Sequence, residues 1–149
     1  MNEEYFKWYS PSLSLDIEML TFGHSGQPVI LFPTSQGRYY ENKDFKLIDA
    51  VQQQLDEGKI KIYCPDSIDT LSWYNKDVHP AVRVKNHRWY EQMIKKEIIE
   101  TALEETGFDK IVVAGCSFGG YHAANLAFRH PELVSHLFCM SGAYDMSGQ

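Results

Sequence analysis

The sequence lacks the features that would assign it to nucleic-acid binding, secretion or a membrane. Its 149 residues contain 14 Lys and Arg against 20 Asp and Glu, a net charge of −6. An acidic chain without a basic cluster binds a phosphate backbone poorly, so we expect no nucleic-acid partner. The opening residues, MNEE, lack the basic and apolar regions of a secretory signal. No apolar run is long enough to cross a bilayer, so the sequence predicts a cytoplasmic protein without a membrane partner.

Cysteine is also scarce, with Cys64, Cys116 and Cys139 widely separated along the chain. An odd number of thiols, none at metal-ligand spacing, predicts reduced cysteines and neither a metal site nor a cofactor. We expect Cys116 and Cys139 to lie on adjacent strands as small apolar residues.

The remaining composition, 44% hydrophobic and 23% charged, is that of one folded domain over residues 1–149. Strand-like runs alternate with helical periodicity, which predicts an α/β fold with a mostly parallel, doubly wound sheet. The last residues, 141–149, are loop-like, so the chain ends after a strand without a closing helix. We predict strands at 5–9, 13–19, 28–32, 59–63, 111–114 and 134–140, and helices at 44–57, 80–106 and 118–129.

A serine motif stands between one predicted strand and the helix that follows it. Residues 115–119, Gly-Cys-Ser-Phe-Gly, fit G-x-S-x-G, the pattern of a nucleophile elbow. Side chains at Gly115 and Gly119 would collide in so sharp a turn. We expect Ser117 to be the nucleophile and the Phe118 amide to stabilise an oxyanion at the helix N-terminus. The alternative is a glycine-rich turn with a merely exposed serine.

A second oxyanion donor is expected in the loop after the 28–32 strand. The Ser35 amide is the best candidate, with Thr34 or Gln36 as alternatives. An ordinary polar loop is the competing interpretation.

With these motifs, the sequence resembles the α/β-hydrolase fold, and most closely the esterase family that includes esterase D and the mycolyltransferases. The resemblance covers nearly the whole chain, although many relatives carry His-Gly where this chain has Pro33-Thr34. It implies an acyl-serine intermediate that is released to water or to another acceptor. It also implies that the triad acid and histidine follow the strand ending near Met140, so the fold is expected to be C-terminally incomplete. The matching segments are residues 28–37, WYN at 73–75, Tyr90-Glu91, GCSFGG, RHPELV and MSGAYD.

The histidines within the chain are weak candidates for the catalytic base. His122 lies on the serine's own helix and should point away from the elbow. His130, at the end of that helix, is expected to complement the helix dipole. His79 and His87 could line a pocket, or they could act as caps or in local hydrogen bonds. We expect His24 and His136 to lie far from the site, and Asp145 is a weak candidate for the triad acid.

Three residues are expected to shape the substrate cleft. Asp66 follows the 59–63 strand at its carboxyl end, and Trp73 and Tyr74 lie in the loop beyond it. Loops at this end of parallel strands commonly carry binding residues, although simple loop packing would also explain them.

The sequence therefore predicts a serine carboxylesterase acting on small acyl esters, impaired as this 149-residue chain. The alternatives are an acyltransferase and a non-catalytic binding or scaffold protein with a hydrolase fold. We also expect homo-oligomers to form through the exposed edge of the last strand.

Overall fold

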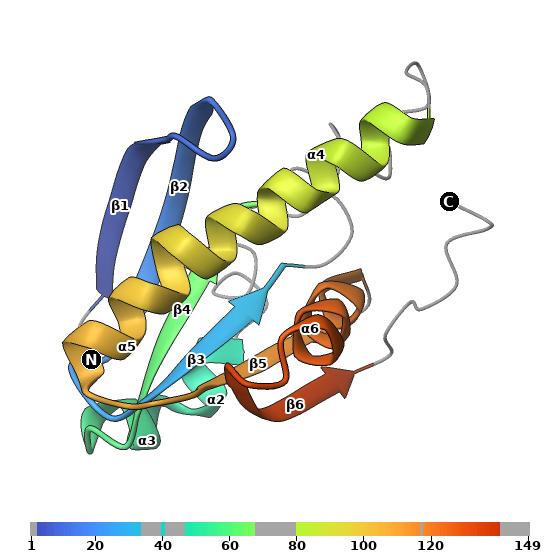
Figure 1. The fold of residues 1–149 in the computed structure, drawn as a ribbon. Helices are drawn as coiled ribbons and strands as arrows, with labels where there is room; N and C mark the ends of the chain where they lie inside the picture. Colours follow the sequence, from blue (N-terminus) through green and yellow to red (C-terminus); the bar gives the residue numbers. More distant parts are fainter. Residues whose placement is uncertain (1–2, 34–39, 41–46, 68–79, 117, 141–149) are drawn as a thin grey trace.

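The structure is a computed structural model that describes residues 3–33, 40, 47–67, 80–116 and 118–140. Strands and helices alternate along most of the chain (Figure 1). The strands are β1 (Glu3–Ser10), β2 (Leu15–Phe22), β3 (Gln27–Phe32), β4 (Ile60–Pro65), β5 (Ile111–Cys116) and β6 (Val134–Met140). The helices are α2 (Leu47–Ala50), α3 (Gln52–Asp56), α4 (Pro80–Met93), the π-helical η1 (Ile94–Ile99), α5 (Glu100–Thr106) and α6 (Phe118–Arg129).

The six strands form one sheet in the order β1-β2-β4-β3-β5-β6. β1 and β2 are antiparallel, and β2 also runs antiparallel to β4. β4, β3, β5 and β6 are parallel to one another. The prediction of a mostly parallel α/β sheet is therefore confirmed. The predicted pairing of molecules through β6, at the outer edge of this sheet, stays a prediction.

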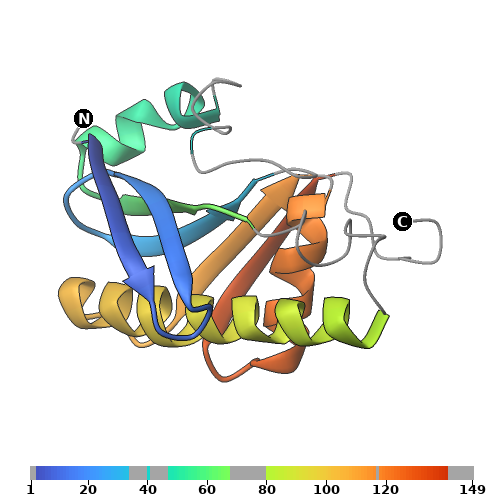
Figure 2. The same cartoon turned by 90° about the horizontal axis from the view of Figure 1, so that it is seen from above.

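Helices cover both faces of the sheet, as Figure 2 shows from above. Side chains of a strand alternate between its two faces, and β3 shows the consequence. Ile30 and Phe32 pack with the helices from α4 to α6, whereas Leu31 packs with Ile48 and Leu55 of α2 and α3. The doubly wound arrangement thus divides the core into two layers.

The predicted helix over residues 80–106 is present, and one side of it packs into the core. Tyr90, Met93, Ile94, Ile98 and Ala102 are all buried. Gly107 closes α5 in the left-handed conformation at φ 77°, which favours glycine at this position. The π-helical turn in the middle of this helix was not predicted, because a search for a 3.6-residue period has no means of detecting it.

The predicted helix at 44–57 is interrupted, so that prediction is partly wrong. Val51 has φ −116° and separates α2 from α3. Val51 is β-branched, and such residues fit a helix less well than straight-chain ones. Residues 44–46 lie outside the described residues. Within the described ranges, no helix combines the length and apolar character needed to span a bilayer; the cytoplasmic location stays a prediction.

Candidate active site

The serine motif lies where strand β5 gives way to helix α6. β5 ends at Cys116 and α6 begins at Phe118, so one residue separates the two elements. That residue, Ser117, lies outside the described residues, and its role stays a prediction. The backbone of Phe118 opens a helix of 12 residues. Unpaired N–H groups at such an end favour negative charge, which suits the predicted oxyanion role of the Phe118 amide.

The two glycines of the motif are required because neither position has room for a side chain. A Cβ atom on Gly115 would lie 2.1 Å from the carbonyl oxygen of Gly119 and 2.7 Å from the amide nitrogen of Gly120. A Cβ atom on Gly119 would lie 2.5 Å from the carbonyl oxygen of Pro33. All three separations are far below van der Waals contact, and the atoms they involve are backbone atoms that cannot rotate away. The predicted crowding on both sides of Ser117 is confirmed.

The contacts around Gly119 also show that the end of β3 lies against the start of α6. The carbonyl oxygens of Phe32 and Pro33 lie against the first turn of α6, with the Phe32 oxygen 2.7 Å from the Cβ position of Gly119. The loop with the predicted second oxyanion donor, Ser35, leaves β3 at this point. Ser35 and its alternatives lie outside the described residues, so the second donor stays a prediction.

Small residues hold α6 close to the sheet. Ala123 and Ala124 are buried, and the Cys139 thiol donates to the carbonyl oxygen of Gly120 at 3.4 Å. Cys116 and Cys139 lie on the adjacent strands β5 and β6, as predicted, because Cys139 pairs with Gly115 and Met140 with Cys116.

His122 points away from solvent and packs among aromatic rings. Its ring centroid lies 5.4 Å from that of His87, 5.3 Å from that of Tyr90 and 5.6 Å from that of Phe32. His87 is buried as well, and together they line a hollow of only about 10 Å³. Burial, with the charges of His122 and Arg129, lowers the pKa of His87 to about 3. An imidazole of so low a pKa is a weak proton acceptor, so His87 is a poor general base.

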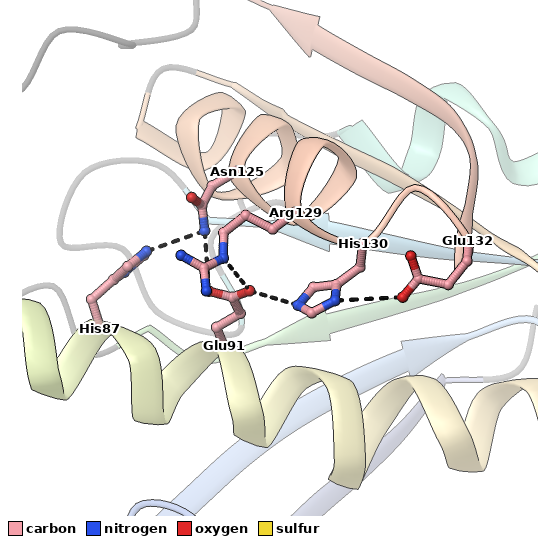
Figure 3. A network of polar contacts seen from close by, with 6 residues as sticks. All are labelled: His87, Glu91, Asn125, Arg129, His130 and Glu132. Atoms are coloured by element: carbon pink, nitrogen blue, oxygen red, sulfur yellow. Dashed lines mark hydrogen bonds and ion pairs between the residues drawn. The ribbon is translucent and has the colours of Figure 1, made fainter.

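A polar network joins α4 to the end of α6 (Figure 3). The Glu91 carboxylate, 8% exposed, accepts from Arg129 Nε at 2.9 Å and lies 2.7 Å from His130 Nε2. Asn125 Nδ2 lies 3.4 Å from both Glu91 Oε2 and His87 Nε2. His130 therefore holds Glu91, in addition to standing at the helix end as predicted. Sequence reasoning missed the network because its partners lie 34–39 residues apart along the chain.

Asp66 lies at the carboxyl end of β4, as predicted. It is 8% exposed; its amide donates to the Glu18 carbonyl at 3.0 Å, and its carbonyl accepts from the Tyr90 hydroxyl at 2.5 Å. These contacts tie its backbone to β2 and α4. Its predicted role in substrate binding stays a prediction. Trp73, Tyr74, His79 and Asp145 lie outside the described residues.

The remaining histidines lie away from the elbow. His24 is exposed in the turn between β2 and β3, beside Gly58. His136 is exposed on β6, with Nδ1 3.2 Å from the Ser135 hydroxyl. Across the part of the chain that the structure describes, no group of three His, Cys, Asp or Glu side chains is placed to hold a metal ion.

Comparison with known proteins agrees with this fold. Residues 85–148 match the family described as alpha/beta hydrolase fold. The S-formylglutathione hydrolase FrmB of Staphylococcus aureus has a similar structure, with a TM-score of 0.69 at 9% identity, over 97% of this chain and 58% of that one. A CE1 ferulic acid esterase of Anaeromyces mucronatus gives 0.70 at 14% identity, over 95% and 59%. MPT51 of Mycobacterium tuberculosis gives 0.68 at 21% identity, over 95% and 51%.

This chain therefore spans between 51% and 59% of the length of these three proteins. At such low identities the similarity establishes the fold alone. No curated protein sequence matches the chain.

Proposed function

We propose that this chain, which has the α/β-hydrolase fold, is the nucleophile-bearing part of a serine carboxylesterase. The steric fit around Ser117 is the observation that supports the proposal most strongly. Gly115 and Gly119 are both pressed against backbone, and β5 passes to α6 over one residue between them. Such a strand–serine–helix arrangement is the setting in which a serine hydroxyl is presented at the carboxyl edge of a hydrolase sheet.

The proposed reaction uses an acyl-serine intermediate. Ser117 Oγ attacks the carbonyl carbon of the ester while a general base accepts the hydroxyl proton. The C–O bond to the alcohol breaks, and the protonated base returns the proton to the leaving alcohol. Water then attacks the acyl group, its proton passes through the base to Ser117 Oγ, and the carboxylic acid leaves. The amides of Phe118 and Ser35 hold the oxyanion in both steps, and Asp66, Trp73 and Tyr74 shape the cleft for the ester.

The base is proposed to come from residues after Gln149. His87 is buried with a pKa near 3, and His122 packs among aromatic rings. His130 is engaged with Glu91. From the family resemblance, the acid and then the histidine are expected to follow Met140. Without a base a serine hydroxyl is a poor nucleophile, so the 149 residues alone should show little turnover.

The test compares this chain with the product of the same reading frame extended beyond Gln149. We expect the extended protein to hydrolyse a short-chain p-nitrophenyl ester and to react with a fluorophosphonate at Ser117. Ser117→Ala should abolish both reactions, whereas Ser135→Ala, a change at an exposed serine of β6, should preserve them. A rate typical of esterases from the 149 residues alone, lost in Ser117→Ala, would contradict the outside base. Feruloyl esters and the thioester S-formylglutathione, after the names of the similar proteins, are the first natural substrates to test.

A non-catalytic binding or scaffold protein is the second candidate. It is favoured by the engagement of His87, His122 and His130 in packing and ion pairs. A reading frame that ends at Gln149, together with no fluorophosphonate labelling of Ser117, would support it. An acyltransferase shares the acyl-serine step, and mass spectrometry of the products formed with an added alcohol would identify it.

A further inference from the structure

A groove lies between the β1–β2 hairpin and the helix η1–α5, away from the candidate active site. The hairpin and the helix lie side by side in Figure 1. The groove has a volume of about 460 Å³ and a mostly apolar wall that includes Phe6, Trp8, Met19 and Ile98. None of the described residues that line it comes from β3, β5 or α6. We refer to it as the β1–α5 groove. Its volume falls within the range of small-molecule sites.

At one end of the β1–α5 groove, the lining residues Tyr63 and Glu105 both contact the ammonium group of Lys61. Lys61 Nζ lies 5.4 Å from the centroid of the Tyr63 ring and 2.6 Å from Glu105 Oε1. The cation is thus attracted both by the face of an aromatic ring and by a carboxylate.

The other end, at Trp8 and Glu97, also combines an aromatic ring with a carboxylate. Trp8 Nε1 donates to Glu97 Oε1 at 2.8 Å, and the Ser10 hydroxyl and the Ser12 amide donate to Oε2 at 2.9 and 3.2 Å. All three donors are neutral, and among the described residues no cation lies within ion-pair distance of Glu97. Partial burial opposes ionisation, but a hydrogen bond from the Ser12 side chain, together with those from Trp8, Ser10 and the Ser12 amide, outweighs it and lowers the pKa of the Glu97 carboxyl. A fixed negative charge therefore faces an apolar wall.

We propose that the β1–α5 groove binds a small molecule with an apolar tail and an ammonium head, the head lying against Trp8 and Glu97. The tail replaces water along the apolar wall. The head adds attraction to the indole ring and to the carboxylate. A quaternary ammonium suits this end well, because it needs no hydrogen-bond acceptor and the Glu97 oxygens already accept hydrogen bonds from Trp8, Ser10 and Ser12.

Three ligands with the same tail and different heads test the proposal: octyltrimethylammonium, 1-octanol and octanesulfonate. We expect calorimetric titration at low salt, below the micellar range, to show the ammonium binding about tenfold more tightly than octanol. Octanesulfonate should bind most weakly. Equal affinity for octanol and the ammonium, or no binding of either, would overturn the proposal.

Variants then locate the site. Glu97→Gln should reduce the preference for the ammonium to within about twofold, while the octanol affinity stays the same. Because Glu97 also anchors Trp8, the folding of this variant is checked by thermal melting.

Thr101 supplies a second test. It is exposed and lines the groove, so Thr101→Trp should fill the groove and weaken the binding of both ligands about tenfold. Thr101→Ser, which leaves the groove open, is the matched control. Ammonium binding that survives Thr101→Trp unchanged would place the ligand elsewhere and overturn the proposal.

Discussion

Glycine is required for different reasons at different positions of this chain. Gly107 ends α5 at φ 77°, a backbone conformation that other residues adopt at a cost, yet nothing lies within 4 Å of its Cβ position. Gly115 is required for a steric reason, because backbone atoms would clash with a Cβ atom at this position. Gly107 therefore provides an internal reference for the cost of backbone conformation without a clash.

Gly115→Ala should destabilise the fold more than Gly107→Ala does. The added methyl group at 115 meets the Gly119 carbonyl oxygen at 2.1 Å, so α6 must move away from β5. We expect a loss of about 3 kcal/mol in the free energy of unfolding. Gly107→Ala should lose about 1 kcal/mol, the cost of a left-handed residue alone. Urea denaturation measures both values, and equal losses would show that the elbow can relax around a side chain.

At the residue scale, the sequence predicted the glycines of the motif but not the partners of the buried histidines. The need for Gly115 and Gly119 follows from a local turn, and local geometry can be inferred from a short motif. The stacking of His87 on His122 joins α4 to α6, and it depends on how two helices pack. No pattern within either helix determines that contact.

At the scale of elements, α4 and α6 are joined through Glu91. Its carboxylate is 8% exposed and receives Arg129 and His130 from the end of α6, while α4 holds it in place. A buried carboxylate that loses its charge leaves its cationic partner, here Arg129, without compensation. The network therefore fixes the C-terminal end of the helix whose first turn adjoins Ser117.

Glu91→Gln should loosen this end of α6. We expect the free energy of unfolding to fall by about 2 kcal/mol, less than for a fully buried pair because Arg129 is half exposed. Hydrogen exchange should accelerate in the last turn of α6 and at His130. Glu100→Gln, a change at an exposed carboxylate on the same long helix, is the control and should alter neither quantity. Unchanged exchange in Glu91→Gln would show that α6 is held by its apolar contacts with the sheet alone.

Elements with a strong local signal were predicted with correct bounds. The bounds of α6 and β6 agree with the prediction, because glycine, proline and polar residues mark both ends of each element. The break at Val51 and the π-helical η1 were missed. The hydrophobic period runs through both places, and small backbone adjustments there leave the apolar face of the helix intact.

At the scale of the whole molecule, His87 lies where the long helix, α6 and the sheet meet. It is 6% exposed and packs with His122, which in turn contacts Phe32 of β3. Protonation of His87 would place a charge among groups from both helices and from the core. The pH dependence of the free energy of unfolding therefore reports on the packing of α4 and α6 against the sheet.

The fold should lose stability as the pH falls below about 6.5. Burial, His122 and Arg129 lower the pKa of His87 to about 3 in the folded chain, whereas an unfolded histidine titrates near 6.5. Between these values the unfolded chain binds more protons, so the free energy of unfolding rises with pH across this window and levels off above it. At about pH 5 the contribution of His87 should be a loss of about 2 kcal/mol relative to about pH 8.

His87→Phe removes this titration while keeping an aromatic ring in the cluster. The difference between variant and wild type at about pH 8 measures the change in packing alone. The variant should then lose about 2 kcal/mol less than wild type on going to about pH 5, since its carboxylates still titrate in the same way. Urea denaturation at the two pH values supplies all four free energies. The same pH dependence in both proteins would mean that His87 becomes protonated without opening the junction of α4, α6 and the sheet.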